Sequence, residues 1–213
     1  MKVLFAGPSL HGAIEAGRLE RAPQIRCPGP AQQGDLARAV RHGASAIGLV
    51  DGLYENVAST WHKDSYLVRI DGTRVHMDAV EYGGMLTVFP EGDAGGALSQ
   101  TMLIRQLPPA GEVNIVTKPG RETWGPLGYL AFSKVCTHAG CPVGLYQEVT
   151  HQLLCPCHQS LFDVGPGKDA IPVFGPAPRP LPQLPLYIDP AGYLRAQAPY
   201  DQPVGPSFWW RRD

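Results

Sequence analysis

The sequence has no excess of charge of either sign, which argues against one large class of functions. Its 18 Lys and Arg residues balance 19 Asp and Glu residues, so the formal net charge is −1 and the pI is near 6.6. Proteins that bind nucleic acids concentrate Lys and Arg on a basic surface, because contacts with the phosphate backbone supply most of their affinity. The composition therefore argues against a nucleic-acid partner.

Long hydrophobic runs are also missing. No uninterrupted apolar stretch approaches the roughly 18–20 residues that a membrane-spanning helix needs. The apolar start, Met1–Gly7, is too short for the hydrophobic region of a secretory signal, and no twin-arginine pair accompanies it. The sequence predicts no membrane span in this chain and leaves the cellular location open.

Cysteine is nearly absent outside one short stretch, and proline is concentrated after it. Four of the five cysteines fall between Cys136 and Cys157, and 11 of the 22 prolines fall between Pro166 and Pro206. With 25 glycines as well, the 213-residue chain has many turn-forming residues and little room for long helices. We therefore look for the chemistry of the protein in its C-terminal half.

The first 64 residues have a different pattern from the rest. Lys2–Ala6 and Ala44–Val50 are apolar runs typical of buried strands. Between them, apolar residues recur at the spacing of one face of a helix. From Ser65 onward, short apolar runs alternate with Gly, Pro, Asp and Asn, which is typical of an antiparallel sandwich or barrel. We predict a small α/β segment over 1–64 and a mainly β domain over 65–213. The strands expected in the second part are Tyr66–Ile70, Leu86–Phe89, Met102–Gln106, Val113–Thr117, Tyr129–Val135, Gln152–Cys155, Leu184–Ile188 and Tyr193–Ala196.

Two short segments combine cysteine with histidine. Cys136–Pro142 (CTHAGCP) and Cys155–Ser160 (CPCHQS) each contain two thiols and one imidazole. Sixteen residues separate His138 from Cys155, enough for a hairpin that brings the two segments together at their tips. The six side chains that could bind a metal are Cys136, His138, Cys141, Cys155, Cys157 and His158.

The spacing alone leaves more than one kind of structural centre open. Six soft or borderline ligands within 23 residues are more than one tetrahedral metal ion needs. Two disulfides could use the cysteines alone. A structural zinc site is the other alternative, although zinc modules favour Cys-x2-Cys and His-x3–5-His pairs and each segment here mixes the two residue types. The ligands of such a zinc site would be Cys136, His138, Cys155 and His158.

Both segments resemble the two cluster-binding loops of Rieske iron–sulfur proteins. In that family two cysteines hold one iron of a [2Fe–2S] cluster and two histidines hold the other. The resemblance implies that Cys136 and Cys155 bind the inner iron, and that His138 and His158 bind the outer iron. It also implies a Rieske-type antiparallel β-sandwich with a two-loop cluster-binding subdomain.

A second pair of cysteines makes the chain similar to the quinol-oxidising branch of this family. Cys141 and Cys157 occupy the positions at which that branch has a disulfide joining the two loops. Rieske ferredoxins and ring-hydroxylating oxygenases generally lack both cysteines. The stretch from about Asp71 to Trp210 resembles the Rieske subunit of actinobacterial cytochrome bc1-type complexes.

Three further residues are implied to surround the cluster: Gly140, Ser160 and Pro176. Gly140 belongs to the first loop. Ser160 stands where the family has a serine that donates a hydrogen bond to a bridging sulfide and so tunes the redox potential. Pro176 belongs to Gly175–Pro178, which is similar to the proline loop that covers the cluster.

The function that this resemblance implies is electron transfer from menaquinol to a c-type haem, with cytochrome b and c-type cytochrome subunits as partners. His138 or His158 would contact quinol and take up its proton, and the sequence does not choose between them. A soluble Rieske carrier that serves another redox enzyme is the alternative, favoured by the lack of a hydrophobic anchor. A non-redox metal-binding or scaffold protein is a third hypothesis.

The N-terminal segment resembles the start of TfuA-like proteins, which are associated with YcaO enzymes in peptide thioamidation. The resemblance includes Gly7–Leu10 and Ile47–Gly52, and it stops after about 64 residues. Glu55 and His62 would be candidate catalytic residues in an intact domain, but we interpret them as parts of a solvated loop and Cys27 as a lone thiol. This segment would connect the soluble-carrier alternative to thioamidation.

Phe162 yields a first prediction, because high-potential members of the family have a tyrosine at this position that bonds a cysteine sulfur. Phenylalanine cannot donate that bond, so we expect a lower midpoint potential here, as suits menaquinol. The change Phe162→Tyr should raise the midpoint potential, since a hydrogen bond to the sulfur stabilises the more negative, reduced form. A redox titration that finds no upward shift would contradict this explanation.

Overall fold

The computed structural model describes residues 60–207 of the 213-residue chain. The expected α/β segment lies almost entirely outside the described residues, as do Cys27, Glu55 and the aromatic residues from Phe208 onward. His62 is described; it is exposed and its backbone N–H donates to the Ser65 hydroxyl at 3.1 Å. The predicted domain boundary near Asp64 stays a prediction.

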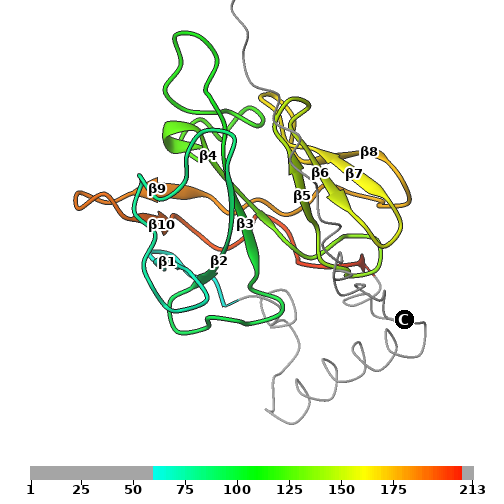
Figure 1. The fold of residues 1–213 in the computed structure, drawn as a ribbon, viewed down its shortest axis with the longest axis horizontal. Coiled ribbons are helices and arrows are strands. Elements are labelled where there is room, and N and C mark those ends of the chain that lie inside the picture. Colours follow the sequence, from blue (N-terminus) through cyan, green and yellow to red (C-terminus); the bar gives the residue numbers. More distant parts are fainter. Residues whose placement is uncertain (1–59, 208–213) are drawn as a thin grey trace, which may run out of the picture.

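The first lobe of the structure is built from two antiparallel sheets (Figure 1). Hydrogen bonds connect them: Tyr66 forms a β-bridge with Arg195, and the Leu184 N–H donates to the Ala131 carbonyl at 2.9 Å. We call this lobe the base. Its four-stranded sheet has the order β1 (Leu67–Val68), β2 (Met85–Pro90), β3 (Thr101–Arg105), β4 (Tyr129–Ser133), and its two-stranded sheet pairs β9 (Leu186–Ile188) with β10 (Leu194–Ala196).

The second lobe is a four-stranded antiparallel sheet inserted between β4 and β9, seen on the right of Figure 1. Its strands follow each other in sequence order, so each pair is joined by a short loop rather than a crossover. The predicted mainly β, antiparallel fold with a two-loop subdomain is therefore confirmed. The strands of this subdomain are β5 (Gly144–Gln147), β6 (Gln152–Cys155), β7 (Ser160–Asp163) and β8 (Ile171–Phe174).

Strands β3 and β4 are buried on both faces and separate two hydrophobic cores. Side chains alternate between the faces of a strand, so Leu103 on β3 points into one core and its neighbours point into the other. The core of the base contains Leu103, Tyr129 and Ala131 with residues of β1, β2, β9 and β10. The second core lies between the base and the subdomain, and contains Met102, Ile104, Leu130 and Phe132 together with Cys136, Cys141, Leu153, Cys155 and Phe162.

All but one of the strands expected from Ser65 onward match the structure, and three strands of the subdomain were not expected. Val113–Thr117 is not a strand: Ile115 is buried, but its N–H bonds the Gly125 carbonyl of a turn instead of a neighbouring strand. The strands β5, β7 and β8 were not predicted. Strand β8 contains Pro172, which has no N–H to donate, and it lies at the edge of its sheet, where proline is tolerated.

Trp61 anchors the first described residues to the base. Its side chain is 1% exposed in the core of the base, and its indole N–H donates to the Ser99 carbonyl and the Thr101 hydroxyl at 3.0 and 2.9 Å. The Asp64 N–H donates to the Ala196 carbonyl on β10 at 2.8 Å. Residues 60–64 therefore pack as part of the base.

Helix contributes almost nothing within residues 60–207. A single 3₁₀ turn, η1 (Pro126–Gly128), precedes β4. No helix in this part of the chain has the length and apolarity needed to cross a membrane.

Arg121 connects three distant segments through a buried polar network. Its side chain is 4% exposed, and it pairs with Asp169 between β7 and β8 and with Asp201 after β10. Its guanidinium also donates to the Gln183 side-chain carbonyl at 2.7 Å and lies over the Trp124 ring. A guanidinium carries enough donors to satisfy all of these acceptors at once.

We predict that Arg121→Ala lowers the free energy of unfolding by about 3 kcal/mol, because two carboxylates lose their shared partner in a poorly hydrated site. Denaturant unfolding measures this loss. Arg74→Ala is the matched control: Arg74 pairs with Glu91, but both side chains are nearly half exposed, so we expect little change. Equal losses in the two variants would contradict the assigned role.

Candidate metal centre

The first loop follows β4 and is closed by its own backbone. The Cys136 N–H donates to the Cys141 carbonyl at 2.9 Å, and the Gly140 N–H donates to the Cys136 carbonyl at 3.0 Å. Gly140 has a φ of 79°, in the left-handed region that glycine adopts without a steric penalty. Val135, which directly precedes Cys136, forms a β-bridge with Pro142, so the loop begins and ends at the same place.

The second loop connects β6 to β7 and begins at Cys155, the last residue of β6. Cys155 pairs with Ser160 across the two strands, so the residues between them form the tip of a hairpin. Gln159 has a φ of 60°, which is uncommon for a residue with a side chain and turns the chain back into β7. The loop therefore has a fixed shape that positions His158.

A disulfide between Cys141 and Cys157 joins the two loops. The Cα atoms of the pair are 6.4 Å apart, within the usual range for a disulfide. The Cys155 sulfur lies within 4.8 Å of both disulfide sulfurs. Since the sulfurs of the disulfide are bonded to each other, they are not free to bind a metal, which leaves Cys136 and Cys155 as the thiols of the site.

The free thiols of Cys136 and Cys155 are buried and face each other. A hydrogen bond from Cys136 to Cys155 raises the pKa of Cys136, as does burial, and lowers the pKa of Cys155 to about 7. Backbone N–H groups also act on both sulfurs, those of His138 and Ala139 on Cys136, and those of Cys157 and His158 on Cys155. The site therefore contains two buried sulfurs, each with backbone N–H donors directed at it.

The two imidazoles lie together on the outer side of the loops. The ring centroids of His138 and His158 are 4.6 Å apart and the planes are nearly perpendicular. His158 is exposed, whereas His138 is half-buried. Burial, and in second place the neighbouring His158, lower the pKa of His138, which favours the neutral form that binds metals.

The two free cysteines and the two histidines fit a metal cluster, and one buried nitrogen atom without a partner supports this. The Nδ1 atom of His138 is buried and has no hydrogen-bond partner. A buried polar atom without a partner is costly unless something occupies the site beside it. With the two buried thiols and the neighbouring ring of His158, the ring of His138 makes two sulfurs and two imidazoles that could hold a cluster, with the sulfurs inside and the rings outside.

The proline loop packs directly on the second metal loop. The Ala177 N–H donates to the Ser160 hydroxyl at 3.1 Å, and both residues are buried. Gly175 has a φ of 83°, and a Cβ atom there would lie 2.6 Å from the Ser160 Cα. Pro176 and Pro178 are exposed on either side of Ala177. The loop therefore lies against the second metal loop through a backbone contact that only glycine permits.

Two residues at the site were missed by sequence reasoning, namely Thr137 and Arg179. The Thr137 hydroxyl donates to the Arg179 carbonyl at 2.8 Å, which joins the first loop to the end of the proline loop. The two residues are 42 positions apart, and no local pattern marks either of them. Phe162, singled out in the sequence, is fully buried on β7 in the same core as Cys136 and Cys155.

The fold and the site together define a small antiparallel β protein with a two-loop cysteine–histidine metal centre, and comparisons with known proteins agree. A family model described as "Rieske [2Fe-2S] domain" matches residues 113–185. A "Cytochrome bc1 complex Rieske iron-sulfur subunit" of Streptomyces lividans is 38% identical over 161 residues, which cover 71% of this chain and 90% of that protein. The chain belongs to the Rieske iron–sulfur protein family, and its cofactor is a Rieske-type [2Fe–2S] cluster.

Longer relatives carry the same name. The subunit of Mycobacterium tuberculosis (strain H37Rv) is 40% identical over 170 residues, covering 68% of this chain, and that of Corynebacterium glutamicum is 48% identical over 118 residues, covering 55%. The chain spans 39% of the length of the mycobacterial protein and 28% of the corynebacterial one. Among solved structures, the soluble domain of Rieske protein II (soxF) from Sulfolobus acidocaldarius is 28% identical, with a TM-score of 0.38 and coverage of 47% of this chain and 64% of that one.

We predict that Gly175→Ala displaces the proline loop, because the new methyl group would collide with the backbone of Ser160. Gly167→Ala is the matched control: Gly167 also has a positive φ, of 71°, but no atom lies within 4 Å of the place where its methyl group would be. Both variants carry the strain of a left-handed alanine, so we expect Gly175→Ala to lose about 1–3 kcal/mol more of the free energy of unfolding.

Denaturant unfolding of both variants measures the difference, and the rate at which the visible absorbance of the cluster bleaches in air gives a second measurement. Faster bleaching in Gly175→Ala alone is expected, since the displaced loop uncovers the site. Equal stability and equal bleaching in both variants would show that the close contact with Ser160 has no consequence.

Proposed function

We propose that Cys136, Cys155, His138 and His158 hold the cluster, and that the protein is the iron–sulfur subunit of a cytochrome bc1-type complex that oxidises quinol. A Rieske cluster supplies a one-electron acceptor of raised potential, because two neutral imidazoles replace two thiolates. The observation that carries the proposal is the arrangement of the loops, with two buried thiols beneath two imidazoles that reach the surface.

His158 is the stronger candidate for contact with quinol. It is exposed, whereas His138 is half-buried with its Nδ1 enclosed. In this proposal Nδ1 faces the metal, so Nε2 is the ring atom that accepts a hydrogen bond from a quinol hydroxyl and takes its proton. The buried thiols and the covering proline loop keep water from the inner side of the site.

The disulfide supports the quinol-oxidising branch over the soluble carrier. Cys141 and Cys157 are bonded to each other, as the resemblance to that branch implies. The named relatives are Rieske subunits of cytochrome bc1 complexes, and in this proposal the chain has the corresponding partners, cytochrome b and a c-type cytochrome. The TfuA-like segment and its link to thioamidation remain a separate hypothesis, on which the described residues do not bear.

Reconstitution tests this function directly. The full chain, loaded with its cluster, is added to a cytochrome bc1 complex from which the Rieske subunit has been removed, and menaquinol-dependent reduction of the c-type haem is measured. We expect the wild-type chain to restore activity and His158→Ala to abolish it through loss of a ligand and of the quinol contact.

The matched control is His151→Ala. His151 lies in the turn between β5 and β6, where its Nδ1 is 3.1 Å from the Tyr146 hydroxyl, and it is not part of either metal loop. It should retain most of the activity. A wild-type chain that contains an intact cluster but neither binds the depleted complex nor restores haem reduction would contradict the bc1 assignment and favour the soluble carrier.

A further inference from the structure

The segment that follows β10 leaves the base and reaches the metal centre. In Figure 1 it crosses from the base to the lower end of the subdomain. Residues 200–206, which we call the strap, are anchored in the base at their start. The Tyr200 hydroxyl lies 2.6 Å from the Thr101 hydroxyl, and Asp201 pairs with Arg121 and accepts from the Gln183 N–H at 2.7 Å.

The strap then packs beneath the first metal loop. Val204 is 2% exposed and forms a small core with Val135, to which Leu98 and Tyr200 also contribute. Val135 immediately precedes Cys136. The hydrophobic contact of the strap therefore ends one residue from a proposed cluster ligand.

Arg179 connects the strap to the proline loop. Its Nη2 donates to the Pro203 carbonyl at 2.7 Å and also to the Gly205 carbonyl, and its Nη1 donates to the Gln202 side chain at 3.4 Å. Arg179 directly follows Gly175–Pro178, and its own carbonyl accepts from Thr137. The side chain of Arg179 thus binds the strap, while its backbone continues the proline loop and binds the first metal loop. Arg179 connects all three segments.

The proline loop depends on such a support because it has few amides of its own. Pro176 and Pro178 have no N–H, so Ala177 supplies the one amide between them, and this amide is bonded to Ser160. That bond holds the Ser160 oxygen in place and polarises its O–H as a donor. A shift of Arg179 would move the loop and this bond together.

We propose that the strap fixes the proline loop over the cluster, and that Arg179 is the positioning residue through which it acts. The planar guanidinium suits this role, because it can donate to two carbonyls of the strap at the same time. The inference deepens the proposed function and rests on its cluster site. It does not depend on the quinol or on the bc1 partners.

The experiment compares Arg179→Ala with wild type in the full, cluster-loaded chain. Hydrogen exchange of the Ala177 amide reports on the loop itself, and we expect it to become faster by about tenfold or more, since Arg179→Ala removes three hydrogen bonds of a charged group and one such bond corresponds to roughly tenfold. The midpoint potential should fall, because the Ser160 hydroxyl is then a poorer donor to the cluster. Arg179→Lys should restore part of both properties, since the ammonium keeps the charge and can donate but lacks the planar fork of the guanidinium.

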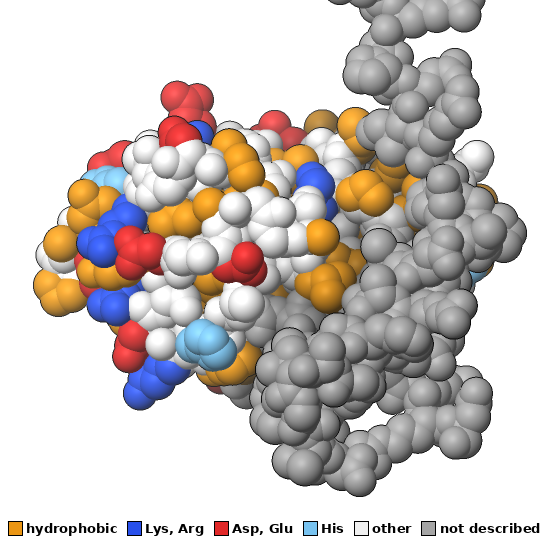
Figure 2. All heavy atoms as spheres, turned by 90° about the horizontal axis from the view of Figure 1, so that it is seen from below, with side chains coloured by type: hydrophobic (Ala, Val, Ile, Leu, Met, Phe, Trp, Pro, Cys, Tyr) orange, Lys and Arg blue, Asp and Glu red, His pale blue; other side chains and the backbone are white. Residues whose placement is uncertain are grey.

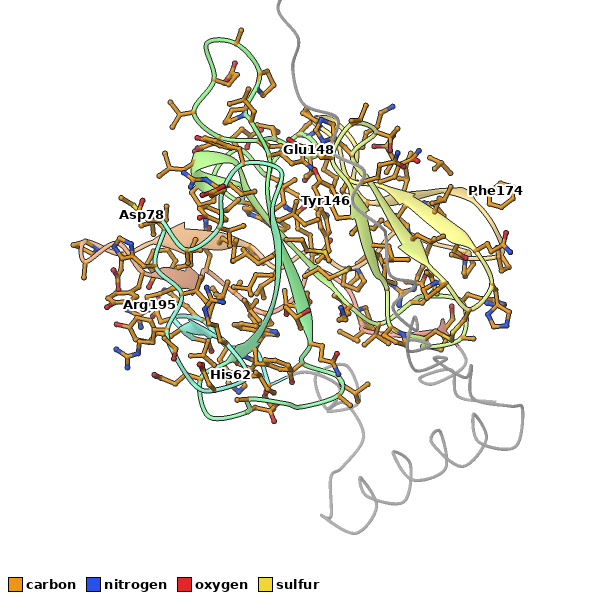
Figure 3. All side chains as sticks on the ribbon, in the orientation of Figure 1. His62, Asp78, Tyr146, Glu148, Phe174 and Arg195 are labelled. Carbon is orange, nitrogen blue, oxygen red and sulfur yellow. A yellow bond between two sulfur atoms is a disulfide. The ribbon has the colours of Figure 1, made fainter. Side chains whose placement is uncertain are left out.

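Arg195→Ala is the matched control. Arg195 donates twice to the Asp64 backbone carbonyl, at 3.0 and 2.6 Å, and lies in the base on the side away from the subdomain (Figure 3). It should leave the Ala177 exchange and the potential unchanged. If it alters them as much as Arg179→Ala does, the effect is one of general stability and the proposal is wrong.

Unchanged Ala177 exchange in a folded Arg179→Ala protein would overturn the proposal equally. If Arg179→Ala does not fold, Val204→Ala tests the same strap, because it trims the contact with Val135 that seats the strap and so loosens the carbonyls to which Arg179 donates. Faster Ala177 exchange in Val204→Ala supports the strap, and unchanged exchange rejects it. A chain that passes these tests but fails to restore quinol oxidation would contradict the proposed function alone.

Discussion

The arrangement of the site depends on two loops from different parts of the subdomain meeting at one place. Neither loop contains a complete ligand set, since each offers one free thiol and one imidazole. The Cys141–Cys157 disulfide constrains their approach, and the bond from Ala177 to Ser160 adds the proline loop as a third element. Once the loops meet, backbone N–H groups point at both buried sulfurs and offset the cost of burying charge there, and the rings are left on the outside.

The base provides the rigid support that this arrangement requires. Alternation along β3 and β4 sends neighbouring side chains into two cores, so the same strands close the base and carry the subdomain. Arg121 and the strap add polar connections between the two lobes. Figure 2 shows acidic and basic side chains interspersed on one face, in keeping with a chain whose charges balance.

The chemistry of the site could be predicted from the sequence to a large extent, because the two metal loops are local. Spacing marks six candidate ligands, and the resemblance to Rieske proteins selects Cys136, His138, Cys155 and His158 and pairs Cys141 with Cys157, a disulfide that the structure contains. The strands of the base were also predictable where apolar runs such as Leu86–Phe89 are long and regular. The strands β5 (GLYQ) and β7 (SLFD) each contain only a pair of adjacent hydrophobic residues, which does not stand out against the loops around them.

What the sequence could not reveal are contacts between distant residues. Arg179 and Thr137 look like ordinary loop residues, and only the folded chain brings them together. Val113–Thr117 was expected to be a strand because it is a short, mostly apolar run between turn-forming residues, but it borders a turn and has no strand beside it to complete a ladder. In both cases the outcome depends on tertiary context that no local pattern encodes.

The central claim is that the two loops enclose a binuclear iron centre with mixed sulfur and nitrogen ligands. Iron, zinc and acid-labile sulfide, measured per chain on protein purified from iron-replete cells, test it most directly. The account predicts two irons and two sulfides in a coloured protein whose reduced form gives the low average g-value of mixed histidine and cysteine ligation. A colourless protein with one zinc ion and no sulfide would contradict it.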